Sequence, residues 1–355
     1  MFKMILNGTL LVFKKKKFDI IEEGFVVIEN GLIQDVGEGY ERGGMDVKDY
    51  IIMPSFINSH THIGDSFAKE SAIGMNVQES VGPEGIKWKL YEKTSEDLII
   101  ESMQDSIRYM LKSGITHFVD FREGGKDGID MLRKALNRSE IKCIILGRDI
   151  DIEYTDGLGV NVYQIDQIPK RRNGKIIAIH AGEETGEVSK AIEYNPDFII
   201  HATLASDEEL EEIAKRGIHV IVCPRSNATL SVGFPRVKKM LDLQINILIG
   251  TDNVMIASPN IFREMEFLYR YSQIYDAVMP TDVLRMATIN AADAFSLNCG
   301  VIEKGRDANL IFIYKNSENL RYSKNIIASI VSRCEPEDVR KVMIGGRFVV
   351  DKDIK

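Results

Sequence analysis

Histidine is scarce in this chain, and the places where it occurs indicate chemistry. Only six histidines occur among 355 residues, and four of them lie at or just beyond the ends of short apolar segments that resemble strands. An aspartate follows another such segment through Gly250-Thr251. The set consists of His60, His62, His180, His201 and Asp252. Imidazole nitrogens and a carboxylate oxygen suit zinc or ferrous iron. The sequence therefore predicts a metal site.

The spacing of His60 and His62 supports this prediction. Side chains at positions i and i+2 of a strand point to the same side, so both imidazoles can face one cation while Thr61 points away. Two hydrogen-bonded buried histidines are the alternative for this pair, and a helix cap is the alternative for Asp252. Five potential ligands at successive strand ends favour the metal site over both alternatives.

Glu183 lies three residues past His180, where the chain can leave the strand and reach back over a metal. A carboxylate in that place can move protons between an activated water and a substrate. The alternative is a surface glutamate that begins a helix, and this applies equally to Glu184 and Glu187. Position alone does not separate the three glutamates.

Substrate contacts are expected from the loops that follow the strands. Trp88, the single tryptophan, can stack on an aromatic base as part of a lid, or it can be a packing anchor. Arg122, Arg148 and Arg225 each follow a predicted strand and can bind a carboxylate or phosphate, with a structural ion pair as the alternative. We expect at most one of these arginines in the pocket, and we take Trp88, Arg148 and Arg225 as the substrate-binding candidates.

A repeated order of strand, loop and helix places these residues. Segments that predict strands occupy residues 50–58, 116–121, 143–147, 159–165, 175–180, 197–201, 218–224 and 246–250. Segments with helical spacing of apolar residues include 96–113, 186–194, 207–216, 235–243, 264–277 and 281–290. Eight such units over about 250 residues match a TIM barrel, whose active site lies at the C-terminal ends of its strands. His117 and His219 begin their strands, so we interpret them as structural.

The two ends of the chain are rich in predicted strands instead. These lie at residues 4–13, 24–29, 32–36, 310–314, 326–331, 342–344 and 347–350, with turn signals at Asn30-Gly31 and Gly345-Gly346. The lysines at 14–17 are expected at a solvated hairpin tip. The predicted fold class is α/β, with a (β/α)8 barrel over residues 52–304 and a small β-sandwich made from residues 1–51 and 305–355.

Composition narrows the classes of partner. The 45 Lys and Arg against 53 Asp and Glu give a net charge of −8, which argues against nucleic-acid binding. Apolar runs fall short of the ~20 residues that cross a bilayer, so we expect a cytoplasmic protein without a membrane partner. Four cysteines without a CxxC pair predict neither disulfides nor a cysteine zinc site. A small-molecule substrate is expected, and a homo-oligomer is compatible with the sequence.

The motifs also resemble a known family, the amidohydrolase superfamily. The likeness is to its aminohydrolase branch, which includes cytosine deaminase, guanine deaminase and the deaminases of S-adenosylhomocysteine and methylthioadenosine. The matching segments are Pro-Ser-Phe-Ile-Asn-Ser-His-Thr-His at 54–62, His-Ala-Gly-Glu at 180–183, residues 201–210, Cys-Pro-Arg-Ser-Asn at 223–227 and Gly-Thr-Asp-Asn at 250–253. Residues 27–33, 287–292 and 305–310 resemble less specific end motifs of the family.

The resemblance implies a role for each matching residue. One divalent metal, Zn²⁺ or alternatively Fe²⁺, would be held by His60, His62, His180 and Asp252. Glu183 would be the proton shuttle, and His201 would orient or ligate the attacking water, whose protons it manages with Asp252. Binuclear relatives need a lysine on the fourth strand, and residues 159–165 contain none, which favours a single metal. The short stretch from Cys143 to His180 predicts an open pocket or one that a neighbouring subunit completes.

The function expected from the resemblance is hydrolytic deamination of a purine, pyrimidine or pterin type heterocycle, with release of ammonia. Two alternatives remain open. The same site could hydrolyse an amide or a carbon–halogen bond, or the barrel could have lost its reaction and serve as a binding scaffold. The presence of Glu183 beside the ligands favours an enzyme, because a scaffold has no need of a proton shuttle.

Overall fold

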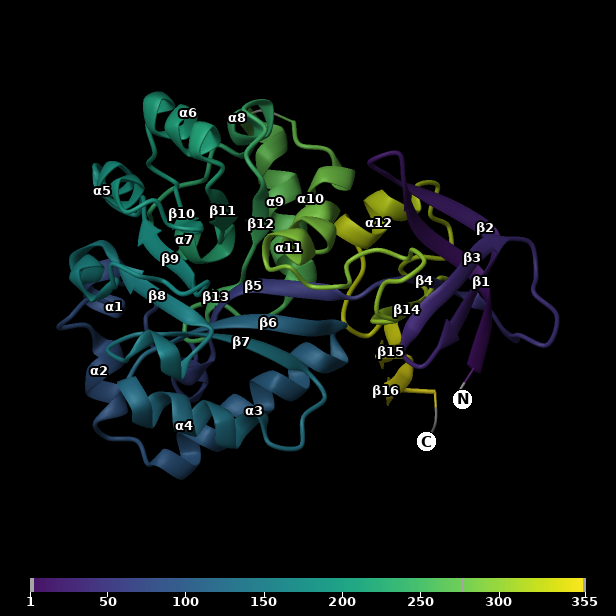
Figure 1. The fold of residues 1–355 in the computed structure, drawn as a ribbon, viewed down its shortest axis with the longest axis horizontal. Coiled ribbons are helices and arrows are strands. Elements are labelled where there is room, and N and C mark those ends of the chain that lie inside the picture. Colours follow the sequence, from purple (N-terminus) through teal and green to yellow (C-terminus); the bar gives the residue numbers. More distant parts are fainter. Residues whose placement is uncertain (1–2, 276, 354–355) are drawn as a thin grey trace. The chain divides into compact units, whose positions relative to one another are not determined.

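The computed structural model describes residues 3–275 and 277–353, which group by their contacts into two units. The first consists of Met1–Ile57, Met110–Thr116 and Met279–Lys355, and the second of Asn58–Tyr109 and His117–Val278. Figure 1 follows the chain through both units, and the colours show that the first unit combines the two ends of the sequence.

The first unit is built on a mixed sheet to which both chain ends contribute. Within the described residues it has seven strands in the order β16-β15-β14-β4-β1-β2-β3. Their bounds are β1 Lys3–Lys14, β2 Lys17–Glu29, β3 Leu32–Glu38, β4 Met45–Pro54, β14 Leu310–Tyr314, β15 Val339–Ile344 and β16 Arg347–Asp351. Strand β1 pairs antiparallel with β2 and parallel with β4. This arrangement confirms the predicted β-rich part made from both ends.

Its hairpins follow the sequence signals. Asn30 and Gly31 have φ values of 51° and 86°, and they join β2 to β3 where Glu29 faces Leu32. Positive φ at both central residues is what a two-residue hairpin of type I′ requires. The predicted lysine tip is also found, because Lys14 pairs with Lys17 and the residues between them are exposed.

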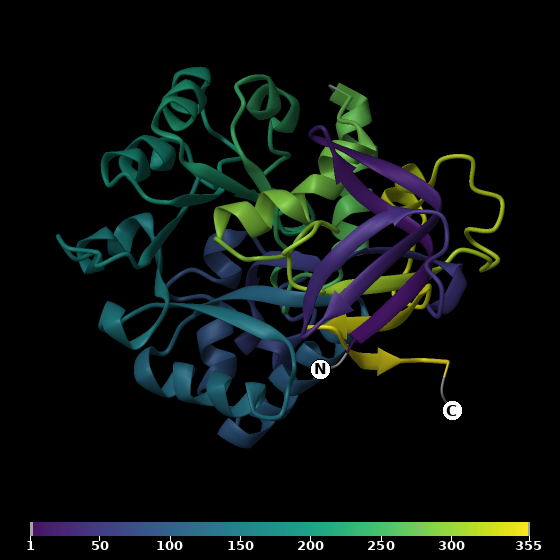
Figure 2. The same ribbon diagram turned by 45° about the vertical axis from the view of Figure 1, so that its right-hand side comes forward.

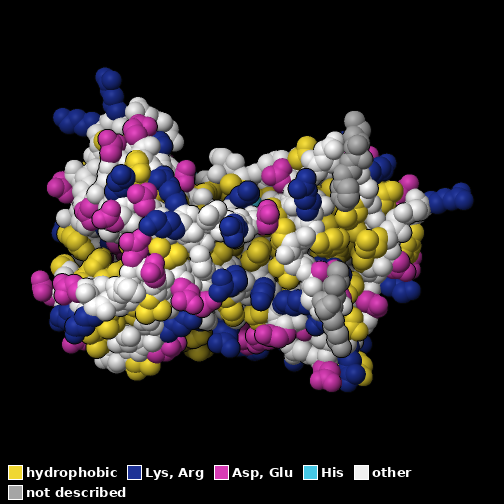
Figure 3. All heavy atoms as spheres, turned by 90° about the horizontal axis from the view of Figure 1, so that it is seen from below, with side chains coloured by type: hydrophobic (Ala, Val, Ile, Leu, Met, Phe, Trp, Pro, Cys, Tyr) yellow, Lys and Arg dark blue, Asp and Glu magenta, His cyan; other side chains and the backbone are white. Residues whose placement is uncertain are grey.

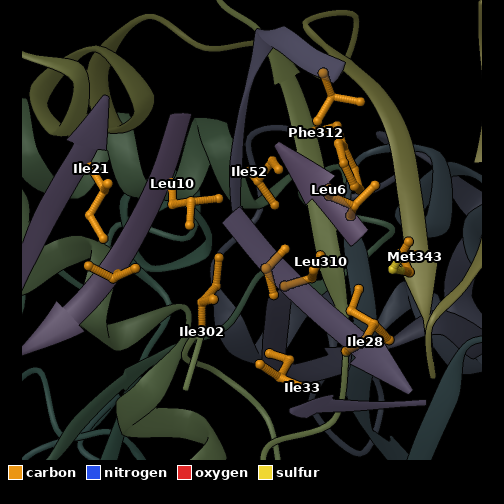
Figure 4. Packing of buried hydrophobic residues seen from close by; sticks show 14 residues of the cluster. Leu6, Leu10, Ile21, Ile28, Ile33, Ile52, Ile302, Leu310, Phe312 and Met343 are labelled. Atoms are coloured by element: carbon orange, nitrogen blue, oxygen red, sulfur yellow. The ribbon is translucent and has the colours of Figure 1, made fainter. Parts of the chain in front are cut away.

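Apolar side chains from both chain ends form one buried cluster in this unit. Figure 4 shows Leu6, Leu10 and Ile28 from the first strands close to Leu310 and Phe312 from β14. All five are fully buried. Because the cluster needs strands from residues before 55 and after 309, neither end can bury its apolar face without the other.

One predicted strand of this unit is wrong. Residues 326–331 form helix α12, Ile326–Ser332, rather than a strand. The segment is rich in isoleucine and valine, which favour strands. The side chain of Asn325, however, accepts a hydrogen bond from the N–H of Ala328 and caps a helix. Of the helix residues only Ile330 and Val331, toward its end, are buried, so the segment does not present the two buried faces of a central strand.

The second unit contains a curled sheet in which the assigned strand pairs are parallel. Within residues 3–275 it has nine strands in the order β12-β11-β10-β9-β8-β7-β6-β5-β13. Their bounds are β5 Phe56–His62, β6 Ile115–Arg122, β7 Lys142–Gly147, β8 Gly157–Asn161, β9 Ile176–Ala181, β10 Phe198–His201, β11 His219–Val222, β12 Ile247–Ile249 and β13 Asp252–Asn253. The chain leaving β12 returns as β13 to pair with β5, and the predicted α/β barrel fold is confirmed.

The first predicted barrel strand, residues 50–58, is in fact two strands. Residues up to Pro54 belong to β4 of the mixed sheet, and β5 of the curled sheet starts at Phe56. Ser55 lies between them, where its N–H bonds to the carbonyl oxygen of Asn309 and the next N–H bonds to that of Gly114. The apolar run is continuous because both sheets bury it, so the sequence did not show the break.

Helices follow the strands along the chain. They are η1 Ile63–Ala68, α1 Val77–Ser80, α2 Ile86–Tyr91, α3 Glu96–Lys112, α4 Gly125–Leu136, η2 Ile152–Tyr154, η3 Val162–Gln167, α5 Glu187–Glu193, α6 Asp207–Arg216, α7 Pro224–Thr229, α8 Val237–Asp242, α9 Ile261–Tyr275, α10 Pro280–Met286 and α11 Ile289–Ala294. Helices α4, α5, α6 and α8 lie outside the curled sheet (Figures 1 and 2). The predicted helix at 281–290 is divided into α10 and α11 at Thr288, whose φ and ψ are not helical.

The surface carries both signs of charge. On the face seen in Figure 3, acidic and basic side chains are interspersed. Among the described residues, no helix has both the length and the apolar character that crossing a membrane requires.

Candidate metal centre

Two imidazoles at the end of β5 face the same side of the strand. Between His60 and His62, the hydroxyl of Thr61 turns the other way and donates to the carbonyl oxygen of Val119 and to Oδ1 of Asp120, both at 3.0 Å. The same Oδ1 accepts the N–H of Ile63 at 2.8 Å. Asp120 thus fixes the strand end on both sides of His62, and the predicted direction of Thr61 is confirmed.

Asp252 reaches this strand end through a tight connection after β12. Asn58 binds Thr251 twice, with its Oδ1 accepting the backbone N–H at 3.0 Å and its Nδ2 donating to the hydroxyl at 2.7 Å. The carboxylate of Asp252 lies with Oδ1 3.0 Å from Nε2 of His60, while Oδ2 accepts the hydroxyl of Ser226 at 2.5 Å. Both oxygens are therefore oriented before any ligand binds.

Glycine is required at position 250 by the closeness of His60. A Cβ at Gly250 would lie 2.5 Å from the Cβ of His60 and 2.9 Å from its backbone nitrogen. We expect Gly250→Ala to displace His60 and to reduce zinc content, together with a loss of stability of about 1–3 kcal/mol for overpacking. Zinc analysis of the purified variant and urea unfolding measure both effects.

As a control, Gly217→Ala adds only backbone strain, since no atom lies within 4 Å of its Cβ, and it should keep full zinc content. Normal zinc content in Gly250→Ala would mean that the position of His60 does not require glycine at residue 250.

His180 and His201 end the neighbouring strands β9 and β10. Nδ1 of His180 lies 3.2 Å from the carbonyl oxygen of Val160. His201 and Ala202 both have positive φ, 75° and 47°, a conformation that costs free energy in residues other than glycine. Such strain is found where the surrounding structure holds a side chain in a functional position.

The tautomers of His62 and His180 show that their facing nitrogens fit a cation. Nδ1 of His180 must carry its proton, because a carbonyl oxygen only accepts. Nδ1 of His62 lies 2.9 Å from Oε1 of Glu123, whose pKa is held well below its ordinary value, against the effect of burial, by Lys87 and His62. Burial lowers the pKa of His180 well below its ordinary value, so Nε2 of this neutral ring presents a lone pair, whereas Glu123 raises the pKa of His62 despite burial. The two Nε2 atoms are only 3.3 Å apart, and a cation can take the place of a proton between them.

The remaining ligand candidates lie around the same point. Ligand atoms of His60, His62 and His180 lie within 4.8 Å of one another, and so do those of His60, His201 and Asp252. Burial lowers the pKa of His60 to about 4, which keeps this imidazole neutral and able to donate a lone pair. The pKa of Asp252 lies well below its ordinary value because the contacts with His60 outweigh burial. The structure thus brings all five predicted ligands together, in a set that fits a divalent ion such as zinc.

The structure also separates the three glutamates that follow His180. Oε2 of Glu187 accepts the N–H groups of residues 182, 183 and 184 at 2.9–3.0 Å, and Glu184 is exposed and accepts from Gln78. Oε1 of Glu183 lies 3.7 Å from Nε2 of His201, and burial raises the pKa of this carboxyl group. Of the three, Glu183 is the one beside the histidine cluster.

These side chains open into a cavity of about 330 Å³. Arg148 lines it, with Nε donating to the carbonyl oxygen of Gly159. Arg225 and Trp88 are not among the described residues that line it. The guanidinium of Arg225 is held by Glu264 and by the carbonyl of Ser258, and the Trp88 indole donates to the carbonyl of Gly82 at 2.9 Å. The structural alternatives therefore describe Arg225 and Trp88 better than substrate contact does.

Three charged residues beside His62 were not predicted from the sequence. Glu123 follows β6, Lys87 lies on α2 and Asp65 lies in η1, and all three side chains are buried. An acid directly after a barrel strand was a signal that could have identified Glu123. Nothing in the sequence indicated the burial of Lys87, which stands between Ile86 and Trp88.

The parallel barrel and its histidine cluster are typical of metal-dependent hydrolases, and comparison with known proteins agrees with this class. Residues 51–155 and 165–349 match the amidohydrolase family. The chain is 37% identical to an uncharacterized protein of Methanocaldococcus jannaschii over 90% of this chain and 93% of that one. It is 33% identical to a protein named as an aminohydrolase in Methanothermobacter thermautotrophicus, over 97% of both. The chain therefore belongs to the amidohydrolase family and has its metal-dependent hydrolase architecture.

More distant similarities extend over nearly the whole chain. A 5-methylthioadenosine/S-adenosylhomocysteine deaminase of Caldicellulosiruptor saccharolyticus is 25% identical over 98% of this chain and 92% of its own length. A crystal structure of an adenosine deaminase from Xanthomonas campestris with bound zinc superposes with a TM-score of 0.78 at 16% identity, over 98% and 93% of the two chains. A guanine deaminase structure from C. acetobutylicum gives 0.76 at 18% identity, over 98% and 100%. The structural likenesses support the fold.

Proposed function

We propose that this protein is a hydrolytic deaminase that removes an exocyclic amino group from a nitrogen heterocycle and releases ammonia. The observation that carries the proposal is the position of Glu183, a carboxyl group of raised pKa that lies 3.7 Å from His201 at the edge of the histidine cluster. A carboxyl group whose pKa burial raises, placed beside the ligands, suits proton transfer to a ring nitrogen. Simple substrate binding would not require it.

His60, His62, His180 and Asp252 would hold one divalent cation, for which zinc is our first choice and ferrous iron the alternative. When bound, such a cation makes hydroxide available near neutral pH, where free water supplies almost none. The contribution of the chain is to fix the ligands. The carbonyl of Val160 sets the tautomer of His180, and Ser226 orients the carboxylate of Asp252.

Three side chains would manage the protons. Asp252 stays ionised, because its pKa is well below the ordinary value, and its carboxylate can accept a proton from the attacking water. His201 is placed to orient that water. Glu183 would donate to the ring nitrogen next to the carbon under attack, and a second proton transfer lets the amino group leave as ammonia.

The cavity limits the class of substrate. About 330 Å³ is at the lower end of the range for small-molecule sites, which suits one heterocycle with a modest substituent. The deaminase relatives act, by their names, on adenine nucleosides, which favours a purine ring in this cavity as well. Arg148 and Asn161 on the wall can then contact polar groups of the substrate.

Ammonia release tests the proposal. Zinc-loaded protein is incubated with adenosine and its 5′-substituted forms, guanine, cytosine, pterins, a substituted amide and a chlorinated triazine. We expect ammonia, above the metal-free control, from at least one amino heterocycle. Amine or chloride release without ammonia would favour the alternative hydrolase reactions, and a complete absence of turnover in zinc-loaded protein would favour the scaffold reading.

A further inference from the structure

A buried group of charges lies beside His62, at the Nδ1 side of its ring. Nζ of Lys87 lies 2.7 Å from Oε1 of Glu123 and 2.9 Å from Oδ2 of Asp65. The three side chains are only 1–4% exposed. Buried charges persist only when they are paired and hydrogen-bonded, so each of these groups depends on the others.

Glu123 connects this group to His62. Its Oε1 lies 2.9 Å from Nδ1 of His62 as well as 2.7 Å from Lys87. The pKa of Lys87 is raised despite burial, because two carboxylates face the ammonium, so the pair is ionised. The carboxylate of Glu123, 2.9 Å from Nδ1 of His62, favours a proton on that nitrogen, and Nε2 of the same ring faces Nε2 of His180, 3.3 Å away.

Asp65 connects the same group to the strand that carries Asp252. Its Oδ1 accepts the hydroxyl of Tyr91 at 2.8 Å, and its Oδ2 accepts the side-chain amide of Asn253. Asn253 follows Asp252 directly in β13. Lys87 and Tyr91 both belong to α2, so this short helix joins the end of β5 to β13 through one continuous set of polar contacts.

We propose that Lys87 and Glu123 are positioning residues that set the affinity of the centre for its divalent cation. The inference rests on the metal site of the proposed function. Lys87 holds Glu123 in one place by its charge, and Glu123 fixes the tautomer and the orientation of His62. Hydrogen-bond partners of metal-binding histidines commonly change metal affinity by 10- to 100-fold when they are replaced.

The position of α2 gives this pair a second consequence. Gln78, Gly82 and Lys87 of the segment between β5 and α3 line the substrate cavity, as do Glu123 and Arg148. The ammonium of Lys87 therefore contributes both to the wall of the cavity and to the orientation of His62, with Arg148 farther from Glu123 at 3.8 Å. Disturbing Lys87 is expected to weaken cation binding even when no substrate is present.

The test measures zinc affinity rather than turnover. Zinc is titrated against a chromophoric chelator in the wild type, Lys87→Met, Lys87→Arg and Glu123→Gln, and the absorption spectrum of each cobalt-substituted protein is compared. We expect affinity to fall by about 10- to 100-fold in Lys87→Met and Glu123→Gln. Lys87→Arg keeps the charge and should recover part of the loss. Lys89→Met, on the exposed side of the same helix, should bind zinc as the wild type does.

Folding is controlled separately. Lys87→Met removes the ammonium between two buried carboxylates and leaves Glu123 with Arg148 at 3.8 Å, so thermal unfolding of each metal-free variant is recorded. The double variant Lys87→Met/Glu123→Gln restores part of the charge balance. Where Lys87→Met does not fold, the zinc affinity of Glu123→Gln tests the positioning role. Unchanged zinc affinity in the folded variants, or a raised KM without any loss of affinity, overturns the positioning role. A wild type that binds no zinc overturns the proposed function itself, and the two failures are therefore distinct.

Discussion

Replacing Glu183 by glutamine is expected to lower kcat for ammonia release by about 10²- to 10⁴-fold, the usual contribution of a positioned acid or base. The amide has the size of the carboxylate and can still lie beside His201, whose Nε2 is 3.7 Å from Oε1 of Glu183. It cannot give up or take a proton. Zinc content should remain that of the wild type, because Glu183 is outside both groups of converging ligand atoms.

Steady-state ammonia release and elemental analysis of the same preparation measure the two parts of this prediction. Glu193→Gln is the control, since Glu193 is an exposed glutamate of α5 in the same segment and should keep full turnover. Loss of zinc from Glu183→Gln would mean that Glu183 is a ligand. Unchanged kcat would mean that another group carries the proton.

The convergence of the candidate ligands could be predicted from the sequence because strand geometry is regular. His60 and His62 are two residues apart in a strand, so they must share a face, and parallel strands bring their C-terminal ends to one edge. His180, His201 and Asp252 each lie at the end of a strand or follow one, so the parallel sheet brings them to the same edge. Strand order and periodicity thus predict that they converge, although not the backbone conformations that hold them.

Loops and side-chain directions were less predictable. Glu183, Glu184 and Glu187 differ in role because one of them accepts three backbone N–H groups, a turn geometry that has no simple sequence signature. Arg225 follows a strand as Arg148 does, yet it turns to the buried carboxylate of Glu264 on a later helix. Partners separated by 39 residues are set by the packing of the whole unit and not by local sequence.

Backbone strain at the site was equally invisible in the sequence. His201 and Asp252 have φ values of 75° and 59°, in the left-handed region that such residues rarely adopt. Their neighbours make these conformations tolerable. A Cβ at Gly182 would lie 2.7 Å from Ala202, and Asn58 binds Thr251 twice. Holding these two side chains at strand ends therefore lowers the stability of the folded protein.

Replacing His180 by alanine should separate cation binding from the stability of the fold. Without a metal, Nε2 of His180 faces Nε2 of His62 at 3.3 Å, and Nδ1 of His180 donates to the carbonyl oxygen of Val160 at 3.2 Å. Removing the ring deletes both contacts, so metal-free stability should fall by about 1–3 kcal/mol while the fold is kept. Zinc affinity should fall by more than the roughly 100-fold that losing a ligand's hydrogen-bond partner can cost, because a ligand itself is lost.

Thermal unfolding with and without zinc measures this effect directly. A ligand that binds only the folded state stabilises it by about 2.7 kcal/mol when its free concentration is 100 times Kd. The wild type should show this stabilisation at such a zinc concentration, and His180→Ala should lose nearly all of it together with its turnover. His219→Ala serves as the control because His219 begins β11, where its ring lies 3.2 Å from the Asn246 amide, and its zinc response should be that of the wild type. A zinc response in His180→Ala equal to the wild type would place the cation elsewhere, since His62 and His180 belong to one of the two groups of converging ligand atoms.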